Sequence, residues 1–414
     1  MDLRSVGTWS GSIPAGLHYP RLVHLLYVAE DVPNRDPVLG DGSSMITYEV
    51  LLALPADLEV SLLAFDRGIA VPPEIRARCR DVLLLPLQED SPGLAQRLAL
   101  WRDPSTEARS HPEAVQAVRR LSGAADVTLM HGPHVLGLAR HVEGPLVLQT
   151  VDPWSAALGL SRDLAAGPRR LYWGLRARFA LAGERRLPRR ARLLTVGEAD
   201  ARTWSRALGR PVHSIANGVH RVQRNRQPRP VPVACFIGSL DYQPNIESAQ
   251  TLVREVAPLV WQERPEVQFL LAGRLPVPEV LALAQPRVEI RANVPSMADV
   301  LAEADLAVFP DSYGVGVRNS VQEALAAGLP VVCTPAAARE LVHPSLHVEP
   351  TPEAVARKVL ELLAPAAGAR PGPALAEVAP LRSWADAAAD YLDELRAAVG
   401  AGPGPAPEGS SPPR

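Results

Sequence analysis

An α/β fold with two parallel sheets is predicted by three patterns in the sequence. Short apolar runs alternate with helical patterns, which is typical of sheets built from βαβ units. The alternation occurs on both sides of residues 220–232, a stretch rich in proline and arginine that has no buried periodic pattern. With 414 residues, 47% of them hydrophobic, the chain can form two or three domains with cores of their own. The sequence therefore predicts two Rossmann-like domains.

The apolar runs predict the strands of each sheet in turn. In the first half, they are residues 22–29, 58–65, 126–130, 146–150 and 192–196. In the second half, they are residues 233–237, 267–272, 288–291, 306–309 and 330–333. Between them, helices place apolar residues at steps of three and four, as at Ala249, Leu252, Val253, Val256 and Val260.

The composition along the chain predicts how it is divided. The predicted parts are a flexible N-terminus at 1–19, a first domain at 20–219, a linker at 220–232, a second domain at 233–380, a last helix at 381–399 and a disordered tail at 400–414. The tail is almost wholly glycine, proline, serine and other small residues, which cannot form a packed core.

Charge and cysteine content exclude several classes of protein. A net charge of −2 argues against nucleic-acid binding, which favours a basic surplus. Cys79, Cys235 and Cys333 are far apart, so they are expected to be buried thiols without a disulfide framework or a metal cluster. No apolar run approaches the roughly 20 residues needed to span a bilayer, and the N-terminus lacks a signal-peptide core. A cytoplasmic location is expected.

One segment is locally basic. Between Arg169 and Arg192, arginines are interleaved with aromatic and aliphatic residues such as Tyr172, Trp173 and Phe179. A solvated helix face explains this pattern. The alternative is contact with an anionic membrane surface, at the inner face of the plasma membrane, or with a lipid-phosphate acceptor.

The most informative stretch runs from Gly314 to Val332, because it predicts a glycine loop, a helix and a buried strand in succession. A helix that begins at Asn319 or Ser320 offers unpaired N–H groups to an anion, and glycines let the backbone approach it. Two interpretations of Glu323 remain open. It forms a capping box with Ser320, or its carboxylate accepts hydrogen bonds from a ribose diol.

This stretch resembles the donor-sugar signature of family 4 glycosyltransferases (glycosyltransferases group 1), especially a bacterial branch that makes polysaccharides or natural products. Further segments resemble that family between residues 22 and 399: Gly40–Ser44, Val196–Ala201, Asn217–Val219, Phe236–Asn245 and Leu271–Arg274. The resemblance implies the GT-B fold, in which two Rossmann-like domains face each other across a cleft and the last helix crosses back onto the first domain.

The resemblance also implies the reaction, which is transfer of a hexose from a nucleoside-diphosphate sugar with retention of anomeric configuration. It assigns donor binding to Gly42, Gly238, Arg274, Gly314, Val315, Gly316, Val317, Asn319, Ser320 and Glu323. It assigns catalysis to His131, Asp152 and Arg318, with His131 and Asp152 pointing at the cleft. A loop histidine without a catalytic role is the alternative for His131, and a helix cap before Trp154 is the alternative for Asp152.

No metal and no cofactor besides the nucleotide sugar is expected, because the chain has no Asp-x-Asp pair of the kind that metal-dependent transferases use. Two departures from the family pattern concern the donor. Val315 stands where the family has a second glutamate, and Ser239 and Pro244 stand where many members have an arginine and a lysine that clamp the diphosphate. A catalytically silent scaffold therefore stays open, as does a nucleotide-sugar epimerase. The acceptor is a glycan, a lipid-linked sugar or a small natural product.

Overall fold

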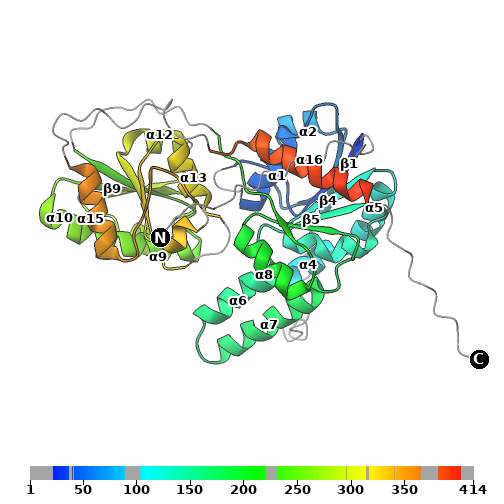
Figure 1. The fold of residues 1–414 in the computed structure, drawn as a ribbon, viewed down its shortest axis with the longest axis horizontal. Coiled ribbons are helices and arrows are strands. Elements are labelled where there is room, and N and C mark those ends of the chain that lie inside the picture. The colour runs from blue at the N-terminus through cyan, green and yellow to red at the C-terminus, as the bar shows by residue number, and fades with distance from the viewer. Residues whose placement is uncertain are drawn as a thin grey trace, which may run out of the picture.

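The computed structural model describes residues 22–36, 40, 42–88, 103–220, 231–294, 296–313, 317–339, 341–364 and 381–401. It contains two sheets of parallel strands, each flanked by helices, in two lobes that lie side by side (Figure 1). The predicted α/β class, with two sheets of parallel strands, is confirmed. Residues 1–19 of the predicted N-terminus, 221–230 of the linker and 402–414 of the tail lie outside the described residues.

The first sheet has the order β3-β2-β1-β4-β5-β6-β7. Its strands are β1 (His24–Ala29), β2 (Glu59–Asp66), β3 (Asp81–Pro86), β4 (Val127–His131), β5 (Leu146–Gln149), β6 (Arg192–Thr195) and β7 (His213–Ser214). All five predicted strands are confirmed to within about two residues at each end. The sequence missed β3 and β7, which are the two edge strands, because β3 is half exposed and β7 has only 2 residues.

The second sheet has the order β10-β9-β8-β11-β12-β13. Its strands are β8 (Val233–Ile237), β9 (Gln268–Gly273), β10 (Val288–Ala292), β11 (Leu306–Phe309), β12 (Val331–Cys333) and β13 (Leu346–Val348). The five predicted strands are again confirmed. Two of them, β8 and β11, are buried along their whole length, which explains their continuous apolar runs. Only the edge strand β13, with 3 residues, was missed.

Helices connect the strands on both sides of each sheet. In the first lobe, they are α1 (Gly42–Ala53), α2 (Pro73–Arg78), α4 (Pro104–Arg109), α5 (Pro112–Ser122), η1 (Pro133–His141), α6 (Trp154–Leu164), α7 (Pro168–Glu184) and α8 (Glu198–Leu208). In the second lobe, they are α9 (Gln243–Thr251), η2 (Leu252–Val256), α10 (Ala257–Glu263), α11 (Pro278–Leu281), α12 (Met297–Glu303), α13 (Asn319–Ala326), α14 (Pro335–Ala338) and α15 (Pro352–Leu363).

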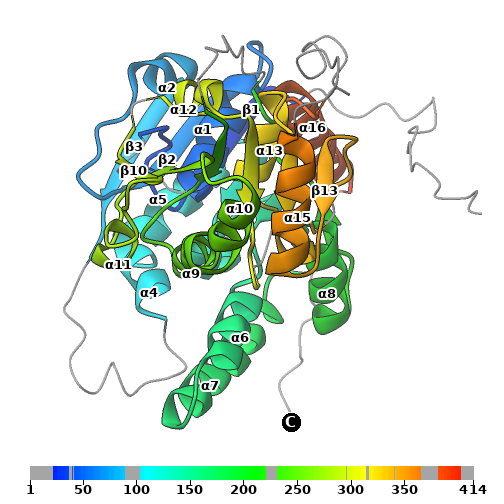
Figure 2. The same ribbon diagram turned by 90° about the vertical axis from the view of Figure 1, so that its left-hand side faces the viewer.

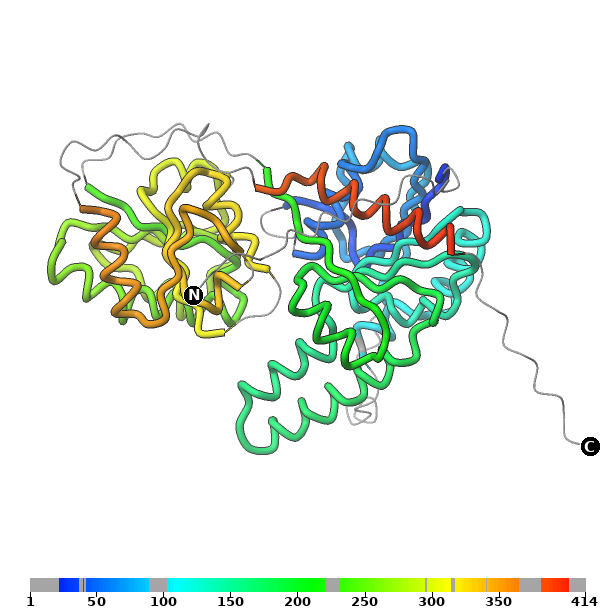
Figure 3. Tube along the Cα trace, in the orientation of Figure 1, coloured from blue at the N-terminus to red at the C-terminus, as the bar shows by residue number. Residues whose placement is uncertain are grey.

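The last helix, α16 (Trp384–Gly400), crosses back onto the first lobe (Figures 1 and 3). Ser383 and Asp386 form a capping box at its start. Its buried face, including Tyr391 and Leu395, belongs to the core of the first sheet. At the other side of the helix, Glu394 accepts a hydrogen bond from Arg192 Nε. A helix that is distant in sequence therefore completes the first core.

The helical pair α6 and α7 forms a hairpin that projects from the first lobe (Figures 1 and 2). Most of the basic segment between Arg169 and Arg192 lies on α7. None of the described helices is both long and apolar enough to cross a membrane. The three cysteines are buried and free, as the sequence predicts.

Candidate functional site

A cavity of about 660 Å³ lies between the two lobes, at the carboxyl ends of both sheets. From the first lobe, the loops after β1, β5 and β6 contribute to its wall, through residues such as Arg35, Asp152 and Val196. From the second lobe, the loops after β8, β9, β11 and β12 contribute. Ligands of open parallel sheets bind at this edge, so the cavity is the candidate site.

Most of the predicted site residues line this cavity. They are Gly42, Asp152, Gly238, Arg274, Val317, Arg318, Asn319, Ser320 and Glu323. Gly314, Val315 and Gly316 of the glycine loop lie outside the described residues. Residues from distant parts of the sequence are thus brought together around one space.

The structure does not bring His131 into the cavity. His131 is the last residue of β4 instead of the first residue of the following loop, because it pairs with Ala29 of β1. Its side chain is fully buried, and Nδ1 lies 3.0 Å from the hydroxyl of Tyr27, whose ring stacks on the imidazole. In this position it has no exposed surface with which to contact a sugar, which contradicts the expectation that it points at the cleft.

Glu323 lies one turn inside α13, the helix that follows the glycine loop. The capping-box interpretation is wrong, because Arg318 is the N-cap, no side chain caps the helix, and the hydroxyl of Ser320 accepts a hydrogen bond from Arg318 Nε instead. Burial raises the pKa of Glu323 to about 7, against the opposing charge of Arg35 from the first lobe. The carboxyl group therefore lines the cavity without a structural role at the helix start.

Arg318 is held more tightly than the sequence indicates. Its guanidinium pairs with Asp311, and its charge lies over the rings of Phe236 and Phe309, at 5.4 and 4.8 Å from their centroids. Asp311 also accepts a 2.6 Å hydrogen bond from Ser248. Nη2 of Arg318 has no hydrogen-bond partner among the described residues. One donor of this arginine is therefore left for a ligand.

Sequence reasoning missed Asp311, although a signal for it exists. It lies two residues after the predicted strand that ends at Phe309, at the sheet edge where ligands of parallel sheets bind. An acidic residue in that position could have been added to the candidate site.

Asp152 lines the cavity from the end of β5. The helix-cap interpretation is wrong, because α6 has Pro153 as its N-cap, and the carboxylate that accepts from its first turn is Glu184, which bonds the N–H of Ser155 at 2.8 Å. Burial and the nearby Asp200 raise the pKa of Asp152 to about 6, and Arg339 of the second lobe opposes the shift. Oδ1 of Asp152 has no hydrogen-bond partner among the described residues. This carboxylate can accept a hydrogen bond from a ligand.

Arg339 also lines the cavity, and sequence reasoning missed it. Its backbone has φ 45° and ψ −115°, a conformation that costs energy for any residue with a Cβ. No ion pair to Arg339 is present within the part of the chain that the structure describes. The run of three alanines before it carries no signal of this conformation.

Close backbone contacts shape the second-lobe wall at two glycines. A Cβ on Gly273 would lie 1.7 Å from the carbonyl oxygen of Gly238, so no other residue fits where the loops after β8 and β9 meet. A Cβ on Gly238 would in turn lie 2.9 Å from Asn245 Nδ2. Both glycines let two loops converge beside Arg274.

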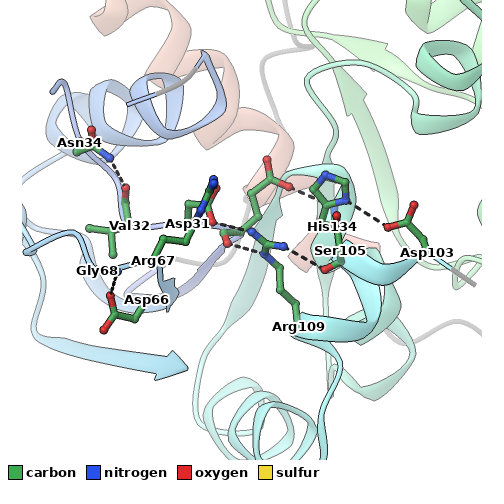
Figure 4. A network of polar contacts seen from close by, with 11 residues as sticks. Asp31, Val32, Asn34, Asp66, Arg67, Gly68, Asp103, Ser105, Arg109 and His134 are labelled. Atoms are coloured by element: carbon green, nitrogen blue, oxygen red, sulfur yellow. Dashed lines mark hydrogen bonds and ion pairs between the residues drawn. The ribbon is translucent and has the colours of Figure 1, made fainter. Parts of the chain in front are cut away.

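A buried polar network holds the first-lobe loop after β1 (Figure 4). Arg109 donates to Asp31 at 2.7 Å and to the carbonyl of Ser105 at 3.0 Å, while Arg67 donates to Asp31 from the other side. Asn34 donates to the carbonyl of Val32 within the same loop. This network fixes the chain just before Arg35, which faces the cavity.

Among the described residues, no group of three or more histidine, cysteine, aspartate or glutamate side chains is placed to hold a metal ion.

Comparisons with known proteins agree with this geometry. Residues 231–365 match the family described as Glycosyl transferases group 1. None of the curated proteins matches the chain. Among solved structures, Anabaena Alr3699/HepE in complex with UDP and glucose is 14% identical with a TM-score of 0.57, covering 92% of this chain and 98% of its own.

Two further structures have the same arrangement. The α,α-trehalose 6-phosphate synthase of Burkholderia multivorans is 12% identical with a TM-score of 0.57, covering 92% of this chain and 100% of its own. WaaG, a glycosyltransferase involved in lipopolysaccharide biosynthesis, is 14% identical with a TM-score of 0.57, covering 91% of this chain and 98% of its own. The second lobe therefore matches the glycosyltransferase group 1 family over residues 231–365, and the whole chain has the GT-B fold.

Proposed function

We propose that this protein is a glycosyltransferase that moves a hexose from a nucleoside-diphosphate sugar to an acceptor with retention of anomeric configuration. The observation that carries the proposal is Glu323, a carboxyl group in the wall of the cavity, one turn inside a helix that no side chain caps. It lies in the glycosyltransferase group 1 domain. The complexes of Alr3699/HepE with UDP-glucose and with UDP and glucose support the class of donor.

In this proposal, the second lobe holds the donor. The carboxylate of Glu323 accepts hydrogen bonds from the ribose diol. The N–H groups of Asn319 and Ser320 at the start of α13, which has no side-chain cap among the described residues, face the diphosphate. Arg274 and Arg339 bring positive charge to the same cavity in place of the family's arginine and lysine clamp. The free Nη2 of Arg318 supplies one more donor.

The chemistry needs charge stabilisation more than a dedicated base. As the bond to the sugar breaks through an oxocarbenium-like state, negative charge develops on the departing diphosphate, and N–H groups and arginines placed beforehand stabilise it. Asp152 accepts a hydrogen bond from the acceptor hydroxyl and orients it. As the hydroxyl oxygen bonds to the anomeric carbon, the proton of the hydroxyl passes to an oxygen of the departing phosphate. His131 positions the strand end through Tyr27 and does not touch the sugar.

A silent scaffold is the second candidate, and one observation favours it. Arg318, at the N-cap of α13, is already neutralised by the buried Asp311, whose side chain is only 4% exposed. If neither Arg274 nor Arg339 contacts the diphosphate, the cavity lacks the charge that catalysis requires.

Titration calorimetry with UDP-glucose and a panel of other nucleoside diphosphates, with and without a chelator, tests the proposal. We expect the nucleoside diphosphate of one particular base to bind tightly, both with and without the chelator. Incubation of that donor with candidate acceptors, followed by NMR of the anomeric proton of the product, then tests transfer and retention. Binding of a donor without transfer to any acceptor favours the scaffold, and absence of all binding rejects a donor site.

We also propose that the hairpin of α6 and α7 contacts an anionic membrane. Leu164 and Leu171, near its tip, are 52% and 68% exposed beside Arg169 and Arg170. Leu171→Asp should reduce sedimentation with phosphatidylglycerol vesicles. Leu281→Asp, at a residue that is 47% exposed in the second lobe, serves as the control and should leave sedimentation unchanged. Equal sedimentation of both variants contradicts this contact.

A further inference from the structure

A second cavity, of about 370 Å³, lies within the first lobe between α4, η1, α6 and α7. Its volume is within the range of small-molecule sites. Apolar side chains from three of these helices form much of the wall, namely Leu136, Leu158, Phe179 and Ala180. Leu158 is only 4% exposed, whereas Phe179 is 40% exposed. The cavity therefore has a buried apolar floor beneath an open rim.

Two arginines leave positive charge in this cavity. Arg140 and Arg186 line it, and neither has an ion pair with any residue that the structure describes. Within the described part of the chain, Arg140 donates to the neighbouring His141, whose pKa is lowered by burial and by this arginine. Both side chains are exposed, so they lie at the rim of the cavity, where an anionic group of a ligand can pair with them.

The carboxylates in the wall do not cancel these arginines. Asp103 is paired with Arg176, which lies 2.8 Å away. Glu184 accepts hydrogen bonds from Ser155 and Trp204, and burial raises its pKa, so that it belongs to the packed structure. Glu107, the remaining carboxylate of the wall, has interactions of its own. The cavity thus combines an apolar floor with two cations.

This second cavity is adjacent to the candidate active site. Asp152 lines the cavity between the lobes and Trp154 lines the second cavity, and a chain of two residues spans at most about 7 Å. Trp154 is fixed by a 2.9 Å hydrogen bond to Asp103 and by edge contact with His134, at 4.8 Å between ring centroids. The backbones of the two cavity walls are therefore close at the buried Pro153, and an acceptor with its hydroxyl at Asp152 has to pass this residue to reach the second cavity.

We infer that the second cavity binds the apolar part of an amphipathic acceptor that also carries a phosphate or carboxylate group. The inference rests on the proposed function, because it places the acceptor hydroxyl at Asp152. The apolar chain or ring system lies on Leu158 and Leu136, and the anion lies near Arg140 and Arg186.

Calorimetry of the full chain with decyl phosphate, kept below its micelle concentration, tests the inference, with decanol and inorganic phosphate as comparison probes. We expect one molecule of decyl phosphate to bind at least 10-fold more tightly than decanol, and no measurable binding of inorganic phosphate. Ala180→Trp fills the cavity and should weaken decyl phosphate at least 10-fold. Ala177→Trp, on the same helix but outside the cavity wall, should leave binding unchanged.

The charge is tested separately. Arg140→Gln combined with Arg186→Gln should reduce the preference for decyl phosphate over decanol, whereas Arg178→Gln, on the exposed side of α7, should not. Equal binding by the parent chain and Ala180→Trp overturns the inference. If decyl phosphate no longer binds to Arg170→Gln but still binds to Ala180→Trp, the inference is also overturned. The binding site of decyl phosphate is then on the surface of the hairpin.

Nucleotide binding distinguishes failure of this inference from failure of the proposed function. If the nucleoside diphosphate binds and decyl phosphate does not, the donor site stands and the second cavity is not an acceptor subsite. If decyl phosphate binds in the cavity and no nucleotide binds anywhere, the cavity remains a ligand site but the link to glycosyl transfer is rejected. Retained nucleotide binding in Ala180→Trp also shows that the variant is folded.

Discussion

Two carboxyl groups in the wall of the large cavity have raised pKa values for the same reason. Burial disfavours the charged form of Glu323 and of Asp152, and an arginine from the opposite lobe partly offsets this in each case. Perturbed groups of this kind gather at functional sites, where unfavourable burial is retained because a ligand uses the group. Because the opposing arginine lies on the other lobe in each case, both pKa values depend on how the lobes meet.

Glu323→Gln should weaken binding of the nucleoside-diphosphate sugar about 10- to 100-fold, because a hydrogen bond to a charged group contributes about 1.5–3 kcal/mol. In the parent chain, binding should strengthen as the pH rises through about 7, since the ribose needs the ionised form of Glu323. Calorimetry at pH 6 and pH 8 checks both expectations. Affinity that does not change with pH in the parent chain, or is equal in the variant, removes Glu323 from the site.

The same group should affect stability with the opposite sign. Folding raises the pKa of Glu323 from 4.5 to about 7, so the folded state binds more protons between these values and its free energy of unfolding falls as the pH rises. Glu323→Gln should therefore gain stability relative to the parent chain between pH 5 and pH 7.5. Urea unfolding of the variant and of the parent chain at both pH values measures the difference in their free energies of unfolding. If this difference is the same at pH 5 and pH 7.5, the carboxyl group of Glu323 is not buried.

Arg339→Gly should separate backbone strain from charge. Glycine adopts φ 45° and ψ −115° without a clash, so we expect a gain of about 1 kcal/mol in stability. Loss of the cation should nevertheless weaken nucleoside-diphosphate binding about 10-fold. Leu275→Gly is the control, because Leu275 also has a positive φ, of 47°, but no charge. Thermal unfolding and calorimetry are the measurements, and unchanged affinity in Arg339→Gly excludes Arg339 from the diphosphate site.

At the scale of elements, α13 and α16 have different tasks. The start of α13 is left without a side-chain cap beside the cavity, which costs stability but keeps N–H groups available to an anion. The start of α16 is fully capped by Ser383 and Asp386, because this helix only has to pack. The difference between the two helix starts is consistent with binding at the first and structure at the second.

Leu395→Ala tests the structural task of α16. Leu395 is fully buried in the core of the first sheet, so its truncation should cost about 2–5 kcal/mol in the free energy of unfolding. Arg396→Ala, on the neighbouring residue whose side chain is 43% exposed, should change it by less than about 0.5 kcal/mol. Urea unfolding followed by tryptophan fluorescence gives both values. Equal effects of the two variants would show that α16 does not complete this core.

At the scale of the molecule, the two sheets present their carboxyl ends to one shared space. Asn217 donates to Asn319 across 3.0 Å, which joins the end of the first lobe to the start of α13. Val317 packs against the core of the first sheet, and the N–H of Val219 donates to the carbonyl of Arg382. The site therefore depends on contacts between lobes as well as on each sheet.

A nucleoside-diphosphate sugar should stabilise the whole chain. At 100 times its Kd, the donor should raise the free energy of unfolding by about 2.7 kcal/mol through mass action, seen as a higher Tm. We expect the same shift with a chelator present, because arginines and helix N–H groups take the place of a metal ion. A shift that disappears with the chelator contradicts metal independence, while no shift with any donor contradicts donor binding.

The sequence by itself determined the layered fold and part of the site. Apolar periodicity reports burial within a few residues, so the central strands, from His24–Ala29 to Val331–Cys333, could be predicted one at a time. The glycine loop and the helix that carries Glu323 are also local patterns. Three edge strands were not predicted: β7 and β13 have only 2 and 3 residues, and β3 is only partly buried.

Only the tertiary structure decided which residues of the site contact one another. That Arg318 is neutralised by Asp311, that Arg339 reaches the cavity, and that His131 is buried against Tyr27 depend on strand order and on loop backbone conformation. These features depend on contacts between residues that are far apart in the sequence, or on strained backbone angles. Neither produces a periodic pattern in the sequence. Local sequence patterns therefore predicted which helices and strands form. Packing between these elements decided which side chains remain available to bind a ligand.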